Sequence, residues 1–246
     1  MKKAYLLFGS LAAFVAVVLI VIVLAVFTVE EQAVIEGDGE VIKESREVTL
    51  FDQVVVEDGI KVYYAPSDEP YLEVEGEENI VPEVQATLER GILEITSDKE
   101  LISDNLRVEA GSPELEKVTT RTSGAFYAYD TVYTSSMEVI AKSESRMELL
   151  GIFDELSVET YSGAEIEFLG ETGNKNVEAT SESVARLQRF ESDLVTVNAE
   201  QNAEARVHAR KKLTATGSSN GKIYYRGNPE IEYVNFSSGA GMDKRP

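Results

Sequence analysis

The sequence contains no cysteine and only one histidine, His208, among its 246 residues. The absence of cysteine excludes disulfide bonds, thiolate metal sites, thiol nucleophiles and a lipidated N-terminal cysteine. With a single histidine, catalytic triads, dyads and histidine-based metal sites are nearly excluded as well. His208 lies in the alternating stretch Ala205-Arg-Val-His-Ala209, which favours a strand residue over a catalytic one. The sequence therefore yields no catalytic, cofactor-binding or metal-binding residue.

Positive charge is also scarce, with 23 basic residues against 44 acidic ones. Lys2 and Lys3 lie at the N-terminus, so residues 28–246 hold 21 basic and 44 acidic residues, a formal net charge of −23. Phosphate backbones and anionic lipid headgroups repel such a domain, and we expect no nucleic-acid partner. A solvated acidic surface explains this excess more simply than a cation site. Calcium-loop spacing and phosphate-binding glycine patterns are absent.

One long uncharged stretch, residues 4–27, follows Met1-Lys-Lys3. As a helix, its 24 residues would be about 36 Å long, against a hydrocarbon core of ~30 Å. The two lysines favour a cytoplasmic N-terminus. A cleaved signal peptide is the alternative, although its apolar region usually spans about 7–15 residues. We expect residues 1–3 to be a cytoplasmic stub, residues 4–27 a single-pass anchor in the cell membrane, and the remainder to be extracytoplasmic.

Strand patterns begin after an acidic segment, residues 28–46, which is either a stalk or a first strand. Residues with period-two alternation, bounded by Gly, Pro and Asp, occur in Phe51-Asp-Gln-Val-Val-Val56 and Ile60-Lys-Val-Tyr-Tyr64. Ile80, Val84 and Leu88 recur every four residues, which predicts a short helix near residues 80–90 with Pro82 in its first turn. We divide the domain, residues 47–246, into an N-terminal part, 47–112, and a repeat part, 113–246.

A loose repeat runs through the second part. A small polar position recurs at intervals of 17 to 20 residues, at Ser123, Ser143, Ser162, Ser181, Gln201, Ser218 and Ser238. A fixed period of this length is typical of stacked repeats. A unit of 19–20 residues fits one coil of a β-solenoid, whose coils pair through parallel ladders about 4.8 Å apart. We therefore predict an all-β solenoid with coils of this length.

Apolar and acidic residues alternate within the repeat, and this alternation predicts which side chains of each strand point inward and which point to solvent. Leu156, Val158, Ile166 and Phe168 are expected to point inward, and Glu159, Glu165 and Glu167 outward. Ser-Gly pairs suit the bends, because glycine reaches positive φ freely and serine can hydrogen-bond nearby backbone. The structural turn residues predicted in this way are Ser123, Gly124, Ser162, Gly163, Ser238 and Gly239.

Several stretches carry a resemblance to a known family. The opening has Val56-Glu-Asp-Gly-Ile-Lys-Val-Tyr63, Leu72-Glu-Val-Glu-Gly-Glu-Glu-Asn-Ile80 and Gly91-Ile-Leu-Glu-Ile95, and the close has Ile223-Tyr-Tyr-Arg-Gly-Asn-Pro-Glu-Ile231 and Phe236-Ser-Ser-Gly-Ala-Gly241. These stretches resemble the GIN domain family, a bacterial family of unknown function whose description refers to an auto-transporter adhesin head. The match covers about residues 47–246. It implies a parallel β-helix on an exported protein and supplies no catalytic residue.

This chain departs from the family in some of its bends. Ser143-Glu-Ser145, Ser181-Glu-Ser183 and Gln201-Asn-Ala203 stand where the family has Ser-Gly-Gly. The resemblance therefore leaves the regularity of the coils between residues 140 and 205 open.

Two concentrations of side chains are candidate sites. The basic one could line one flank of the solenoid across adjacent coils, where a polysaccharide-cleaving groove would need Lys or Arg beside its acids, and it comprises Arg186, Arg189, Arg206, Arg210, Lys211 and Lys212. The aromatic one comprises Tyr63, Tyr64, Tyr71, Phe126, Tyr127, Tyr129 and Tyr133. Strand packing explains most of the aromatic residues, and an exposed ladder for sugar or protein contact is the alternative.

Three functions remain open on these patterns. We expect a membrane-anchored, non-enzymatic, adhesin-like surface module that binds a surface glycan or an envelope protein and needs no cofactor. The second is an envelope enzyme acting on polysaccharide, which requires several acids to converge with a basic residue in one cleft. The third is a structural envelope protein that self-associates through the ends of the solenoid.

Overall fold

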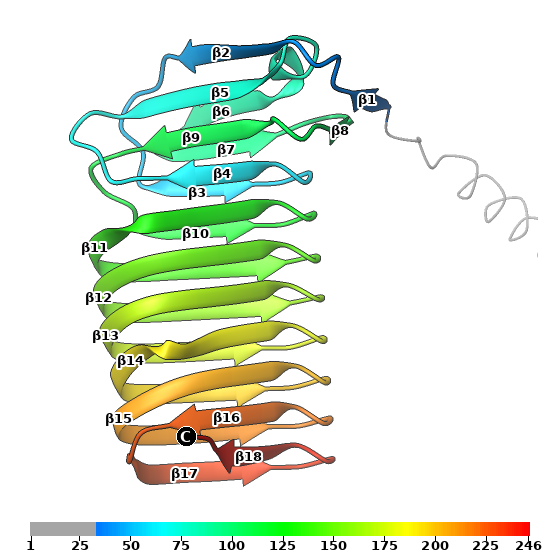
Figure 1. Ribbon diagram of the computed structural model, residues 1–246. Coiled ribbons are helices and arrows are strands. Elements are labelled where there is room, and N and C mark those ends of the chain that lie inside the picture. The colour runs from blue at the N-terminus through cyan, green and yellow to red at the C-terminus, as the bar shows by residue number, and fades with distance from the viewer. Residues whose placement is uncertain (1–32) are drawn as a thin grey trace, which may run out of the picture. The chain divides into compact units, whose positions relative to one another are not determined.

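The repeat in the sequence forms a stack of β-coils (Figure 1). The computed structural model describes residues 33–246, and residues 34–246 form one unit with a continuous apolar core. No helix among these residues has the length and apolar character needed to cross a membrane. The predicted stub, residues 1–3, and the predicted anchor, residues 4–27, lie outside the described residues.

The N-terminal part, which in the structure also takes in residues 34–46, is built from short strands and one turn of 3-10 helix, η1. Its elements are β1 (Val34–Glu36), β2 (Val41–Arg46), β3 (Gln53–Val56), β4 (Lys61–Tyr64), β5 (Tyr71–Glu77), η1 (Val81–Glu83), β6 (Gln85–Glu89), β7 (Ile92–Thr96), β8 (Glu100–Ile102) and β9 (Arg107–Gly111).

The repeat part is built from long strands that wrap around the core. Its elements are β10 (Lys117–Thr120), β11 (Ala125–Lys142), β12 (Arg146–Tyr161), β13 (Glu165–Ala179), β14 (Val184–Ala199), β15 (Glu204–Gly217), β16 (Lys222–Arg226), β17 (Glu230–Phe236) and β18 (Gly241–Lys244).

Each long strand pairs in parallel with the strands of the coils before and after it. Met147 lies opposite Ile166, which in turn lies opposite Ala185, a step of 19 residues each time. The solenoid with coils of about 19 residues is thus confirmed. Leu156, Val158, Ile166 and Phe168 are buried in the interior, as the alternation predicts.

Each coil of the solenoid has two faces and two edges (Figure 1). Face A consists of β9, β4, the first halves of β11 to β15, β16 and β18. Face B consists of β7, β3, β10, the second halves of β11 to β15, and β17. Two-residue turns join face B to face A along the tight edge, and the long strands pass from face A to face B along the wide edge.

The turns of the tight edge share one conformation. Each has two consecutive residues of positive φ, as in a type I′ turn. The pairs are Asp58–Gly59, Thr122–Ser123, Ser143–Glu144, Ser162–Gly163, Ser181–Glu182, Gln201–Asn202, Ser219–Asn220 and Ser238–Gly239. The second residue of a turn donates its N–H to the carbonyl of the first residue in the next turn, as from Glu144 to Ser162 and from Gly163 to Ser181 (2.9 and 3.1 Å). The turns therefore form a hydrogen-bonded column.

This column corrects part of the predicted turn assignment. Gly163 and Gly239 have φ values of +74° and +81°, but Gly124 is not among the residues of positive φ, which are Thr122 and Ser123 in its turn. Gly124 instead follows the turn, where a Cβ would lie 2.5 Å from the Val56 carbonyl oxygen. It is needed for close approach of two coils rather than for its φ.

The bends that depart from the family pattern are as regular as the others. The third residue of Ser143-Glu-Ser145 is buried, and its hydroxyl donates to the Thr120 carbonyl (3.1 Å) while accepting from the Lys142 N–H (3.0 Å). Ser183 likewise donates to the Thr160 carbonyl (2.8 Å). A buried hydroxyl that satisfies backbone groups in this way keeps the coil regular without glycine.

Gly163→Val is expected to lower the free energy of unfolding by about 1–2 kcal/mol, because a β-branched side chain is strained at positive φ. The midpoint of thermal unfolding should fall by roughly 3–8 °C. Gly163→Asn is the matched control, since Asn202 and Asn220 occupy the equivalent position in other turns and Asn tolerates this conformation. Equal midpoints for the two variants would show that the turn conformation is not the constraint.

The N-terminal part closes one end of the stack. β2 and β5 continue face A, and β6 continues face B, each by antiparallel pairing. Residues 34–46 thus contribute strands β1 and β2 rather than a free stalk. The Arg46 guanidinium donates to the carbonyls of Val81 and Val84 and so satisfies backbone acceptors next to η1.

The helix predicted near residues 80–90 is wrong. Only η1 is helical there, and the following residues form β6, which pairs with β7 across the turn Arg90–Gly91 (φ +52° and +81°). A spacing of four, as between Val84 and Leu88, fits two periods of a strand as well as one turn of helix. Residues 85–89 form a strand because the hairpin turn places them beside β7, with which they pair.

The opposite end of the stack is open among the described residues. β17 and β18 pair only inward, with β15 and β16. Ile231, Tyr233 and Val234 on β17 are exposed.

Candidate functional site

Outward side chains on face A form columns that run along the solenoid, because its strands pair in register. The central column comprises Tyr63, Tyr127, Glu148, Glu167, Arg186, Arg206 and Tyr224. Its chemistry changes along the stack from aromatic to acidic and then to basic. Different parts of one face are therefore suited to different ligands.

The aromatic part of the column is a stacked row. The rings of Tyr63 and Tyr127 lie 5.1 Å apart, and those of Tyr127 and Tyr129 lie 6.0 Å apart. The Arg107 guanidinium covers Tyr63 at 3.9 Å from its centroid, and Tyr129 is 61% exposed. This row matches the exposed-ladder alternative.

The other aromatic residues of the predicted concentration serve different roles. Tyr64 and Phe126 point into the core, and the Tyr64 hydroxyl donates to the Ser112 carbonyl (2.8 Å). Burial raises the pKa of Tyr64 to about 12. Tyr71 is half-buried and Tyr133 is exposed near the wide edge, away from the stacked row.

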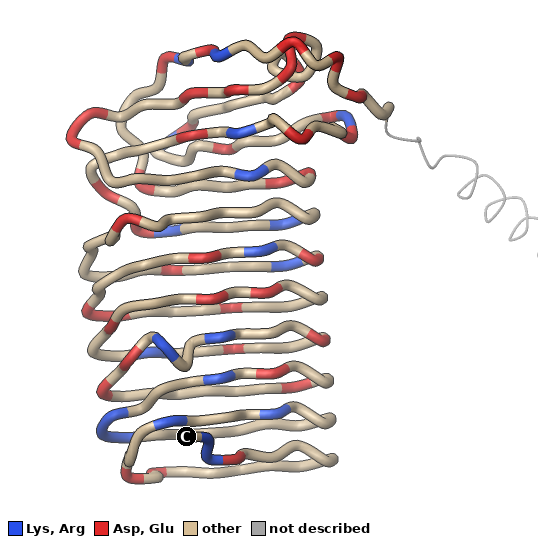
Figure 2. Tube along the Cα trace, in the orientation of Figure 1, with Lys and Arg blue, Asp and Glu red and all other residues tan. Residues whose placement is uncertain are grey.

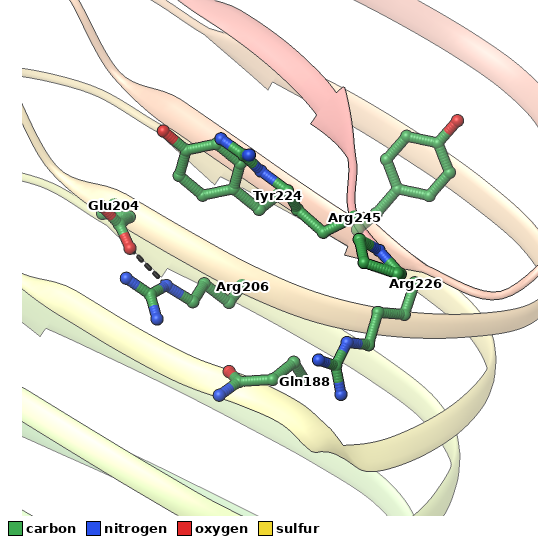
Figure 3. A pocket seen from close by; sticks show the side chains of 8 residues that line it. Gln188, Glu204, Arg206, Tyr224, Arg226 and Arg245 are labelled. Carbon is green, nitrogen blue, oxygen red and sulfur yellow. Dashed lines mark hydrogen bonds and ion pairs between the residues drawn. The ribbon is translucent and has the colours of Figure 1, made fainter.

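A cavity of about 490 Å³ lies at the basic end of face A (Figure 3). Its lining comes from β14, β15, β16 and the residues after β18, namely Gln188, Glu204, Arg206, Tyr224, Tyr225, Arg226, Arg245 and Pro246. Three guanidinium groups and one carboxylate face this space, so its side chains carry a net positive charge.

Two of the three arginines in the cavity are held in place by neighbours. The Arg206 Nε donates to the Glu204 carboxylate. The Arg245 guanidinium lies over the Tyr224 ring, 4.5 Å from its centroid. Arg226 has no carboxylate within 4.0 Å among residues 33–246. Arg245 has no carboxylate partner there either, but its guanidinium already lies over a ring, so Arg226 is the arginine in the cavity best placed to take an external anion.

A β-bulge shapes the wall of the cavity. The pairing of β13 with β14 shifts between Glu167 and Leu169, and the pairing of β14 with β15 shifts after Leu187. Gln188 occupies the irregular position, and its Oε1 is buried without a hydrogen-bond partner in the described part of the chain. Bulges bend a strand and re-aim its side chains, often next to functional sites.

The cavity lies in the C-terminal section of the domain, which has a positive balance, whereas the section before it is strongly acidic. Residues 34–183 hold 35 acidic and 11 basic residues, whereas residues 184–246 hold 7 acidic and 10 basic ones. Figure 2 shows this concentration of Lys and Arg in the last coils. An anion repelled by the rest of the domain is attracted here.

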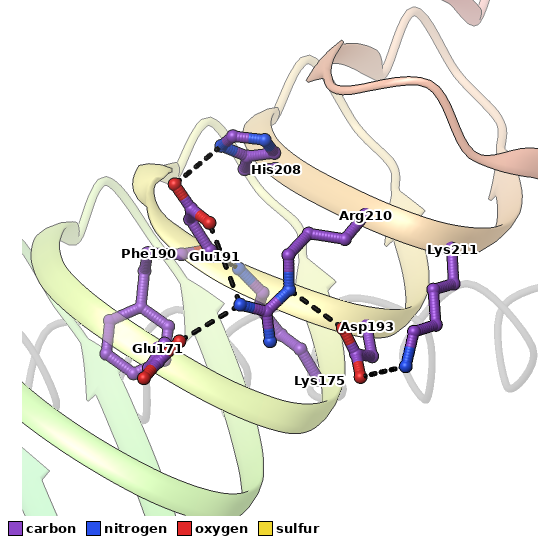
Figure 4. Close-up of polar contacts among 8 residues, drawn as sticks. All are labelled: Glu171, Lys175, Phe190, Glu191, Asp193, His208, Arg210 and Lys211. Atoms are coloured by element: carbon purple, nitrogen blue, oxygen red, sulfur yellow. Dashed lines mark hydrogen bonds and ion pairs between the residues drawn. The ribbon is translucent and has the colours of Figure 1, made fainter.

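The six basic residues noted in the sequence do not form a single groove. Arg186 pairs with Glu165 (2.7 Å) on face A, and Arg189 lies 3.9 Å from Glu167. Arg210 and Lys211 lie at the wide edge instead, where Asp193 pairs with both of them (Figure 4). Lys212, the next residue, pairs with Glu232.

At the wide edge, Arg210 is the centre of a network. It contacts Glu171 (3.0 Å) and Asp193 (2.8 Å), and Lys211 also contacts Asp193 (2.6 Å). His208 is half-buried, with its Nδ1 3.9 Å from Glu191. The network in Figure 4 is an arrangement of mutually paired charges on the surface, and paired charges of this kind stabilise a fold only weakly.

The arginine-lined cavity does not hold the pair of carboxyl side chains that a polysaccharide-cleaving site requires, and the carboxylates that gather around Arg210 lie at the surface of the wide edge, paired with its guanidinium and with Lys211. Glycoside hydrolysis ordinarily needs a pair of carboxyl groups that flank the bond to be cleaved. The basic cavity contains one, Glu204. Among residues 33–246, no group of three or more His, Cys, Asp or Glu side chains could hold a metal ion.

Sequence reasoning missed Gln188, Arg226 and Arg245. A signal for two of them was present, because Arg206, Arg226 and Arg245 follow one another at 20 and 19 residues, the period of the coil. Arg226 stands within the closing stretch Ile223–Ile231, whose pattern indicates a structural role and does not show that the side chain lies on face A.

Comparisons with known proteins agree with this architecture. A family model described as "Putative auto-transporter adhesin, head GIN domain" matches residues 50–229. A "putative adhesin" from Bacteroides fragilis has a similar structure, with 16% identity, a TM-score of 0.80, and coverage of 86% of this chain and 100% of that one. A "putative lipid binding protein" from Parabacteroides distasonis has 21% identity, a TM-score of 0.73, and coverage of 87% and 100%.

A third structure, a "putative adhesin" from Parabacteroides merdae, has 14% identity and a TM-score of 0.69, with coverage of 87% and 100%. No curated protein matches the chain. At such identities the structures show the fold alone. The family model spans most of the chain, and the protein therefore belongs to the GIN domain family.

Proposed function

We propose that the protein is a non-enzymatic surface-binding module of the adhesin type, with a surface glycan or an envelope protein as its ligand. One observation carries this proposal: face A presents groups suited to recognition, a stacked tyrosine row and an arginine-lined cavity whose lining includes a single carboxyl side chain, Glu204. The family description and the names of two similar structures also support an adhesin.

The parallel ladder suits this function because it holds both surfaces rigidly. Each long strand is paired on both sides over most of its length. Side chains fixed in this way lose little conformational freedom on binding. A binding screen of the full chain in detergent against glycans and envelope proteins tests the proposal. Saturable binding to one class is expected, and binding to neither class would contradict it.

Residues 4–27 are proposed to anchor this module in the cell membrane, with the N-terminus in the cytoplasm. Lys2 and Lys3 before the apolar stretch, and Glu30 and Glu31 after it, support the orientation. The chain enters the solenoid at its closed end, so the basic cavity lies toward the other end of the stack. Protease added to intact cells should digest the C-terminal domain, and full protection of the domain would reject this orientation.

Self-association through the end of the solenoid is a second candidate function. It is favoured by β17, which exposes Ile231, Tyr233 and Val234 next to unpaired backbone groups at the edge of the sheet. Light scattering of the full chain in detergent distinguishes the cases. A mass that rises with concentration supports self-association, and a constant mass of one chain rejects it.

A further inference from the structure

We propose that the arginine-lined cavity binds the terminal acidic sugar of a glycan, with the sugar carboxylate on Arg226 and its hydroxyls on Glu204 and Tyr224. The inference rests on the proposed binding function and names the ligand class for one site on face A. It follows from the charge of the cavity, from its size and lining, and from the charges around it.

The charge of the cavity requires an anion. Three guanidinium groups share the lining with one carboxyl side chain, and neither Arg226 nor Arg245 has a carboxylate partner among residues 33–246. A guanidinium presents a planar fork of N–H donors that matches a carboxylate or a phosphate. Arg206 and Arg245 are already oriented, by Glu204 and by the Tyr224 ring. In Figure 3, Arg206, Arg226 and Gln188 lie around one hollow.

The size and lining of the cavity favour a sugar acid over an inorganic anion. About 490 Å³ lies within the range of sites for small organic ligands, and phosphate would occupy a small part of it. Glu204 repels a doubly charged phosphate but accepts hydrogen bonds from sugar hydroxyls. Tyr224, which points outward beside Arg206, adds aromatic surface and a phenolic hydroxyl, and the Gln188 amide adds N–H donors. A sugar acid, which has one carboxylate and several hydroxyls, can bind to all of these groups.

The surrounding charges favour a terminal residue over an extended acidic polymer. Along the central column, Glu167 lies two strands from Arg206, about 10 Å away at the usual spacing, and Glu148 follows it. A uniformly acidic chain laid along face A would meet both carboxylates. One acidic sugar at the end of an otherwise neutral glycan avoids them.

Ligand-observed NMR on the full chain in detergent tests the inference, with glucuronic acid and N-acetylneuraminic acid as probes. We expect at least one of them to bind at least tenfold more tightly than glucose, and phosphate at equal concentration to leave it bound. Polygalacturonate is expected to bind more weakly per carboxylate than the free acid. Displacement by phosphate, equal binding of glucose, or tighter binding of the polymer would overturn the assignment.

Paired variants locate the site. Arg226→Gln is expected to weaken binding of the acidic sugar at least tenfold, whereas Arg189→Gln, which removes the same charge outside the cavity, should weaken it less than threefold. Circular dichroism of both variants shows whether the fold is intact. Equal losses in the two variants would mean that diffuse charge, rather than the cavity, attracts the ligand.

The outcomes also separate this inference from the proposed function. If neither acid binds but the glycan and envelope-protein screen finds another ligand, the cavity assignment is wrong and the binding function stands. If nothing binds in either experiment, both are wrong.

Discussion

Gly170→Ala is expected to be the most destabilising single-methyl change in the solenoid, costing about 4 kcal/mol or more. Gly170 has a φ of +130°, and a Cβ on it would lie 1.8 Å from the carbonyl oxygen of Gly151 in the preceding coil. That oxygen belongs to the parallel ladder of β12 and β13, so it cannot move away without breaking backbone hydrogen bonds. Costs above about 4 kcal/mol arise from such strain at special backbone positions.

Thermal unfolding measures this effect, and a fall in the midpoint of roughly 8–16 °C is expected. Gly59→Ala is the matched control. Gly59 also has a positive φ, +72°, but a Cβ there would meet no heavy atom within 4 Å. Gly59→Ala should lower the free energy of unfolding by only about 1–2 kcal/mol, which is the strain of a side chain in this backbone conformation. If both variants lose the same stability, the close approach of the two coils is not the constraint.

Lys175→Met is expected to stabilise the protein by about 3 kcal/mol at pH 7 and below. Lys175 occupies an inward column with Leu156, Val195 and Leu213, and it is 2% exposed. Its ammonium donates to the Phe190 carbonyl (Figure 4). Burial lowers the pKa of Lys175 from 10.5 to about 7, and Glu191 opposes this shift only in part. A methionine fills the same column without a charge, although the Phe190 carbonyl loses a donor.

The pH dependence has a definite sign. The unfolded chain keeps the proton on Lys175 up to about pH 10.5, whereas the folded chain loses it near pH 7. Because the unfolded state binds more protons between these values, the contribution of Lys175 to the stability of the wild type rises from about pH 7 to 10.5 and is least favourable below pH 7. The advantage of Lys175→Met should therefore shrink as the pH rises through this range.

Urea denaturation at pH 6, 8 and 10 measures this difference between the variant and the wild type. Lys61→Met, on the solvent side of β4, is the control and should keep the pH profile of the wild type. A constant difference between Lys175→Met and the wild type at all three pH values would contradict the buried-lysine account.

Those features of the fold that depend on local pattern could be predicted from the sequence. The inward positions Val158 and Ile166 follow from alternation, and the coil length follows from the spacing of the bends. The exact turn residues could not be predicted in every coil. Thr122 and Ser219 take the first turn position where the sequence pointed to Ser123 and Ser218, because neighbouring small polar residues are equivalent in type. Hydrogen bonds between stacked turns determine which residue takes the first turn position. These bonds reach other coils, so the local sequence does not reveal them.

The candidate site depends on contacts between distant residues to a greater degree. Arg206, Arg226 and Arg245 converge only because three coils stack in register, and Gln188 reaches the cavity through a bulge that no local pattern shows. Lys175 was missed for a related reason. Its neighbours Asn174 and Asn176 make the segment look solvent-exposed, and only alignment with Leu156 and Val195 places it in the core.

The central claim is that this solenoid binds a ligand and does not transform it. The most direct test incubates the full chain with a large molar excess of the ligand that it binds, and then measures both equilibrium binding and the mass of the recovered ligand. The account predicts saturable binding at about one ligand per chain and recovery of the ligand unchanged. Conversion of more than one equivalent of ligand per chain would contradict it and establish an enzyme.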